Sequence, residues 1–107
     1  MSFIATRRFE AAKNLYAQKH YTKEEYGRMV GEVMTDIYIE HKYGHTGYTL
    51  DDFVEKNKED VKVFIDYAGP NAIYERLEDL GYYECKQEVL YERITAIITK
   101  SIEEISK

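Results

Sequence analysis

The chain of 107 residues is 44% hydrophobic and 33% charged, has a net charge of −5, and contains one proline, six glycines and one cysteine. This composition is typical of a single globular domain spanning residues 1–107, and it excludes a disordered chain, an internal disulfide framework and a bilayer span, which needs about 18 or more consecutive apolar residues. Because no secretory signal is visible at the N-terminus either, we expect a cytoplasmic protein that makes no membrane contact.

Apolar residues recur at the spacing of an α-helix in every segment of the chain, so an all-α fold is predicted. A first helix is expected to end near Lys19, and a second to begin at Thr22 and Glu25, whose spacing is that of a capping box. The second helix is expected to stop at Gly44, in the left-handed conformation that commonly ends a helix. The apolar residues predicted to face inward from these two helices are Ala5, Phe9, Ala12, Tyr16, Tyr26, Met29, Val30, Val33, Met34 and Ile37.

Two glycines inside the second predicted helix, Gly27 and Gly31, lie one turn apart on one face. Glycine inside a helix costs about 0.5 to 1 kcal/mol relative to alanine. The pair therefore predicts the close approach of a neighbouring helix, either from the same chain or from a second copy.

The third segment begins with another capping signal, formed by Thr49 and Asp52. Asn57 interrupts its apolar stripe. This residue marks either a break between two short helices, over residues 50–56 and 58–68, or a polar position on a buried seam. The apolar residues of this segment predicted to face inward are Leu50, Phe53, Val54, Val61, Phe64, Ile65 and Ala68.

A short fourth helix closed by Gly81 is expected next, and a long last helix from about Tyr83 to Ser106. Their predicted inward residues are Ile73, Leu77, Leu80, Val89, Leu90, Ile94, Ile97, Ile98, Ile102 and Ile105. About five helices joined by short loops predict a compact bundle, with the isoleucine-rich last helix at its centre.

Charge is distributed unevenly along the chain. Residues 1–23 hold five basic residues and one acidic residue, a local charge of +4, whereas residues 51–92 hold twelve acidic and five basic residues, a local charge of −7. A protein that binds nucleic acid normally presents a basic face, because neutralising phosphates supplies most of its affinity. We therefore expect no direct binding of nucleic acid.

His41 and His45 lie four residues apart at the end of the second predicted helix. Such a pair can supply half of a zinc or nickel site. Because Gly44 is expected to end the helix between them, the pairing is lost, and His41 with Lys42 is interpreted as complementing the negative end of the helix dipole. No metal ligand or cofactor is predicted, and a metal-dependent activity or metal binding through His41 and His45 is the alternative function.

The familiar enzyme motifs are missing from the chain. It contains no glycine-rich nucleotide motif, no nucleophile elbow and no zinc-protease motif, and Cys85 has no histidine at a recognisable spacing. Glu75 and Glu78 form one ExxE pair, but no matching ExxD follows on a second helix. We therefore expect no enzyme activity.

Two features exceed what a purely structural domain requires. Eleven tyrosines are present, and tyrosine is enriched in binding surfaces. In addition, Glu84, Glu88 and Glu92 form a ladder of like charges on the last helix, which either pairs with basic residues of the first helix or faces a basic partner. The basic residues concerned are Arg7, Arg8 and Lys13.

Tyrosines and acidic residues coincide within residues 74–92, and we expect this region to bind a partner protein through that protein's basic surface. The predicted partner-binding residues are Tyr74, Glu75, Glu78, Asp79, Tyr82, Tyr83, Glu84, Glu88, Tyr91 and Glu92. The expected function is that of a small acidic inhibitor or adaptor, including one that mimics nucleic acid, and a homodimeric interaction domain is a further alternative. In size, acidity and tyrosine content the chain resembles small inhibitor or immunity-type proteins of bacteria and their phages.

Overall fold

The computed structural model describes residues 4–44, 47–69, 71–81 and 84–105, and at 84–88, 101–102 and 105 it describes the backbone alone. Six α-helices and one π-helical turn make up most of these residues, and no strand occurs among them, so the all-α prediction is confirmed. The elements are α1 Ile4–Ala17, α2 Lys23–Gly44, α3 Leu50–Lys56, α4 Lys58–Val63, η1 Phe64–Ala68, α5 Asn71–Asp79 and α6 Glu84–Ile105. None of the described helices is long and apolar enough to cross a bilayer.

Reciprocal hydrogen bonds stabilise the starts of α2 and α3. The backbone amide of Thr22 donates to the Glu25 carboxylate at 3.0 Å, and the amide of Glu25 donates to the Thr22 hydroxyl at 3.2 Å. Thr49 and Asp52 form the same pair of bonds before α3, at 3.2 and 3.1 Å. Both predicted capping boxes are therefore confirmed.

Asn57 separates α3 from α4, so of the two alternatives for this residue the break between two helices is the one observed. Its φ of −126° and ψ of 45° lie outside the helical region, and its backbone and side-chain amides both donate to the Phe53 carbonyl, at 3.0 and 2.9 Å. The side chain thus competes with the regular helical bonds of the backbone. Beyond α4 the chain widens into η1, where the amide of Gly69 donates to the Phe64 carbonyl five residues earlier, at 2.8 Å.

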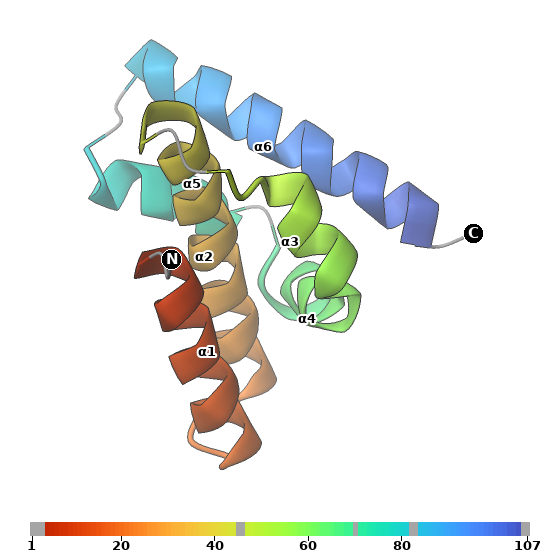
Figure 1. Cartoon of the computed structure of the whole chain (residues 1–107). Coiled ribbons are helices and arrows are strands. Elements are labelled where there is room, and N and C mark those ends of the chain that lie inside the picture. Colours follow the sequence, from red (N-terminus) through yellow and green to blue (C-terminus); the bar gives the residue numbers. More distant parts are fainter. Residues whose placement is uncertain (1–3, 45–46, 70, 82–83, 106–107) are drawn as a thin grey trace.

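The centre of the bundle is α2, which contacts α1, α3, α4, η1 and α5, while α6 lies across the bundle and packs mainly on α3 and α5 (Figure 1). The prediction that the last helix is central is therefore wrong. A helix surrounded by others needs apolar or small residues on most of its circumference, whereas α6 buries one stripe and exposes charged residues elsewhere. The third predicted segment is divided at Asn57, so there is also one α-helix more than predicted.

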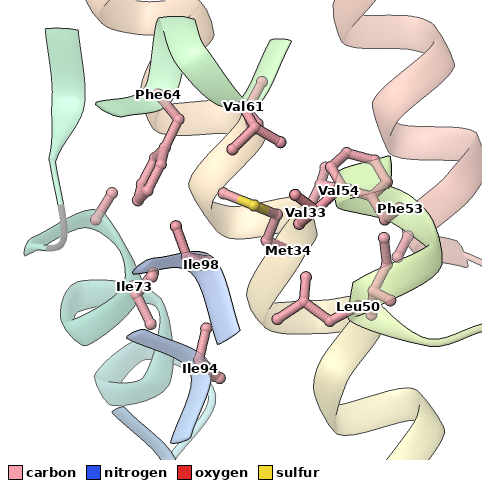
Figure 2. Close-up of a cluster of buried hydrophobic side chains, with 14 of the residues drawn as sticks. Val33, Met34, Leu50, Phe53, Val54, Val61, Phe64, Ile73, Ile94 and Ile98 are labelled. Atoms are coloured by element: carbon pink, nitrogen blue, oxygen red, sulfur yellow. The ribbon is translucent and has the colours of Figure 1, made fainter. Parts of the chain in front are cut away.

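Side chains from α2, α3, α4, η1, α5 and α6 meet in one hydrophobic cluster (Figure 2). Among the α6 side chains that the structure describes, the buried ones are Leu90, Ile94 and Ile98, which are spaced four residues apart. The side chains of Ile102 and Ile105, which were also predicted to face inward, lie outside the described residues. Two residues predicted to face inward are instead exposed, Leu80 by 40% and Val89 by 45%. Leu80 follows the end of α5, and Val89 is turned by about 100° from Leu90, away from the buried stripe.

The glycine pair of α2 lies against α4 and η1. A Cβ atom at Gly27 would be 2.9 Å from the carbonyl oxygen of Val63, and one at Gly31 would be 2.5 Å from Cε1 of the Phe64 ring. Both distances are shorter than real Cβ contacts allow. The predicted close approach is therefore confirmed, and the neighbouring segment belongs to the same chain.

Tyr26 joins α2 to α1 and α4. Its side chain is 1% exposed, its ring stacks on Tyr16 with the ring centroids 4.2 Å apart, and its hydroxyl donates to the Asp60 carboxylate at 2.6 Å. Burial, followed by the hydrogen bond and negative charge of Asp60, raises the pKa of Tyr26 well above its ordinary value of 10.0.

We expect this tyrosine to make the fold sensitive to alkali. Above about pH 10 the unfolded chain releases the Tyr26 proton while the folded chain retains it, so its stabilising contribution is complete below that pH and declines above it. Tyr26→Phe should make the alkaline loss of stability less steep, whereas Tyr67→Phe, at a side chain that is 43% exposed, should not. Urea unfolding between about pH 8 and 11 measures both slopes. Equal slopes in the two variants would contradict the expectation.

Candidate functional site

Eight of the ten predicted partner-binding residues lie on two helices, four on α5 and four on the first half of α6. Tyr82 and Tyr83 lie outside the described residues, as do the side chains of Glu84 and Glu88, although the backbone of both glutamates belongs to α6. The structure therefore places the side chains of the other six, which are Tyr74, Glu75, Glu78, Asp79, Tyr91 and Glu92.

Tyr74 of α5 and Tyr91 of α6 contact each other on this side of the molecule. Their ring centroids are 5.3 Å apart and their planes are inclined by 72°, the edge-to-face arrangement that aromatic rings favour. Tyr74 is 37% exposed and Tyr91 is half-buried. The two rings are thus held in place and still accessible, which suits an anchor residue in a binding surface.

Exposed carboxylates flank the two tyrosines. Glu78 and Asp79 are exposed at the end of α5 and Glu92 is exposed on α6, and neither Glu78 nor Glu92 forms an ion pair within the described part of the chain. Glu75 differs, because its carboxylate lies 3.0 Å from the guanidinium of Arg28 on α2. We call the surface formed by Tyr74, Glu78, Asp79, Tyr91 and Glu92 the acidic-aromatic surface.

A groove of about 500 Å³ follows α6 beside the acidic-aromatic surface. The described residues that line it are Tyr91, Glu92, Thr95, Ala96, Thr99, Lys100 and Glu103. The hydroxyl oxygen of Thr95 is buried in its wall and has no hydrogen-bond partner in the described part of the chain. Because one helix supplies all the described lining residues, the groove is shallow and open, unlike the pockets that normally enclose a small ligand from several sides.

Arg8 of the first helix forms its described ion pairs with α2. The guanidinium of Arg8 lies 3.1 Å from Glu32 and 2.7 Å from Asp36, both on α2, while Glu92 of the ladder is exposed. Among the described side chains, Arg8 therefore pairs with α2 and not with Glu92, since α1 packs along α2 and α6 packs on α3 and α5.

Asp36 is a buried carboxylate that the sequence analysis did not single out. It is 8% exposed and accepts hydrogen bonds from Arg8 at 2.7 Å and from Nε and Nη2 of Arg76 at 2.9 and 3.0 Å, so it joins α1, α2 and α5. The hydrogen bond to Asp36 raises the pKa of Arg76 even though burial acts in the opposite direction. Asp36 follows Thr35 and lies between Met34 and Ile37 on the buried face of α2, and this charged residue within a largely apolar stripe was the available signal.

Asp36, Arg8 and Arg76 form a cluster of ion pairs, and three further residues extend it to the surface. Glu32 lies 3.8 Å from Arg28, and Arg28 lies 3.0 Å from Glu75. With Asp36 and its two arginines, the cluster contains three arginines and three carboxylates, and their charges balance. It holds three helices together, whereas Glu78, Asp79 and Glu92 are exposed outside it.

The histidine pair cannot be assembled from the described residues, because His41 is exposed in the last turn of α2 and His45 lies outside them. Gly44 is the last residue of α2, but the positive φ values of the described glycines occur at Gly69 and Gly81, so the left-handed stop predicted at Gly44 is wrong. Many helices end in this way without a left-handed residue. Over the described ranges, no three side chains of His, Cys, Asp or Glu gather closely enough to hold a metal ion.

Comparisons with protein families, with curated proteins and with solved structures found no match for this chain.

Proposed function

We propose that the protein acts by binding another protein, which presents a basic surface to the acidic-aromatic surface, and that it serves as an inhibitor or adaptor rather than as an enzyme. The observation that carries the proposal is the Tyr74–Tyr91 pair, held edge to face between two helices and flanked by exposed carboxylates. Rigid aromatic side chains supply contact area at a small entropic cost, and they are common among the residues that dominate binding energy.

The two residue types are expected to act at different stages of binding. Glu78, Asp79 and Glu92 attract a basic surface before contact and so raise the association rate. Tyr74 and Tyr91 become covered in the complex and so slow dissociation. Glu75 contributes less to steering, because Arg28 already lies beside it.

Charge reversal on α5 tests the proposal. We expect immobilised wild-type protein to retain one stoichiometric partner from a lysate, and the variant Glu78→Lys/Asp79→Lys to associate with that purified partner about ten-fold more slowly, with a weaker dependence on salt. The matched control, Glu55→Lys/Glu59→Lys, makes the same charge change at exposed positions of α3 and α4. Equal association rates for the variant and its control would disprove the proposal.

Tyr74→Ala should instead speed dissociation, at a cost of about 2 kcal/mol in binding, with Tyr67→Ala on η1 as the control. Surface plasmon resonance with the purified partner separates the two rates. If the partner itself binds nucleic acid, an excess of its nucleic acid should displace the protein, because both present negative charge to one basic surface.

A further inference from the structure

On the outward face of α6, the order of charged residues is complementary to the order on the same face of an antiparallel copy of this helix. Ala96 lies at its middle, with Glu92 four residues before it and Lys100 four residues after it, and all three are exposed. On an α-helix these three residues fall within an arc of about 80°. They therefore form one stripe, opposite the buried stripe of the same helix.

We infer that this face docks a second copy of the chain, with the two α6 helices antiparallel and the two Ala96 residues beside the two-fold axis. Reversal about Ala96 exchanges the positions of Glu92 and Lys100, so each Glu92 faces Lys100 of the second copy. One dimer then contains two such ion pairs, as the symmetry of an isologous interface requires. This inference goes beyond the proposed function, which concerns a different protein as the partner.

The side chains between the charged residues allow two helices to approach closely. Ala96 and Thr99 are small and exposed, and they line the groove along α6. Val89 is 45% exposed and lies seven residues before Ala96, while Glu103 lies seven residues after it. The same reversal places Val89 against the methylene groups of Glu103 from the second copy, so an exposed apolar side chain becomes covered.

Charge complementarity favours a second copy of the chain over other partners, and the antiparallel direction over the parallel one. A parallel pair of α6 helices would bring each Glu92 close to the Glu92 of the other copy, and a uniformly basic partner would oppose Lys100. A single pair of helices covers less area than the roughly 800 Å² per partner of a standard interface. The dimer is therefore weak, and concentrated solutions are needed to observe it.

Sedimentation equilibrium of the full chain, at concentrations up to about 1 mM, measures the self-association. The wild-type mass should rise with concentration from the monomer value of 12.7 kDa towards twice that value. Glu92→Lys and Lys100→Glu each place like charges opposite one another twice, and each should weaken association about ten-fold. An equimolar mixture of the two variants should associate again, because the charges of one then oppose those of the other, and the double variant should do the same.

Two controls make the same charge changes elsewhere. Glu59→Lys and Lys62→Glu lie at exposed positions of α4 and should leave self-association at the wild-type level. Circular dichroism establishes that every variant keeps its helix content. A wild-type mass of 12.7 kDa at all concentrations would overturn the inference, as would variants that associate like the wild type or a mixture that fails to recover.

The two proposals fail separately. Glu92 belongs to both surfaces, so the partner-binding test changes only Glu78 and Asp79 on α5, whereas the dimer test changes α6 and needs no partner. Loss of the heterologous interaction alone leaves the dimer intact, and a strictly monomeric chain leaves the partner-binding result unaffected.

Discussion

Replacing Asp36 with alanine is expected to lower the free energy of unfolding by about 3 to 5 kcal/mol, the range found when one member of a buried ion pair is removed. The loss is large because this one carboxylate binds two partly buried guanidinium groups: the Arg8 side chain is 30% exposed and the Arg76 side chain is 19% exposed. Without Asp36, Arg76 keeps no described ion-pair partner, and both arginines remain partly desolvated. Contacts between α1, α2 and α5 should weaken together.

Urea unfolding monitored by circular dichroism measures this loss of stability. Two further variants identify its cause. Asp36→Asn keeps the volume and removes the charge, so it separates the loss of the ion pairs from the loss of packing. Glu75→Ala breaks the pair with Arg28, in which both side chains are more than half exposed, and should cost less than about 1 kcal/mol. A similar small cost for Asp36→Ala would show that the cluster contributes little to stability.

Gly31→Ala is expected to destabilise the protein by about 1 to 3 kcal/mol, although alanine is the better helix former by about 1 kcal/mol. The added Cβ would lie 2.5 and 2.8 Å from two carbons of the Phe64 ring and 3.1 Å from Cβ of Ala72. The ring is 1% exposed and tightly packed, so relieving the clash requires α2 and η1 to move apart.

Gly44→Ala is the matched control for this substitution. Nothing lies within 4 Å of a Cβ atom at Gly44, and its φ is not positive, so alanine there should stabilise α2 by about 0.5 to 1 kcal/mol. Adding Phe64→Leu to Gly31→Ala should recover part of the loss in a double-mutant cycle. If Gly31→Ala instead raised the melting temperature, the close packing of α2 on η1 would be disproved.

Features that depend on neighbouring residues were predictable from the sequence. The capping boxes at Thr22 and Thr49, and the interruption at Asn57, rest on hydrogen bonds that span three or four residues. The pair Gly27 and Gly31 was informative for a related reason, because glycine inside a helix costs free energy unless another segment comes close. For the capping boxes and Asn57 the signal and its cause both lie within one turn of helix, whereas for the glycine pair only the signal does.

The position of each helix in the bundle was not predictable in the same way. Periodicity shows which face of a helix is buried but not what covers it, so the isoleucine-rich α6 was expected at the centre that α2 occupies. The same limit explains Leu80 and Val89, which continue an apolar sequence pattern beyond the area that neighbouring helices cover.

The same distinction between local and tertiary features applies to the candidate site. By itself the sequence determined that tyrosines and acidic residues concentrate between residues 74 and 92. The tertiary structure decided that Tyr74 contacts Tyr91, that Glu75 lies beside Arg28, and that Asp36 binds Arg76, 40 residues away along the chain. These contacts join separate helices, and their partners are set by how the helices cross in three dimensions, which no short stretch of sequence encodes.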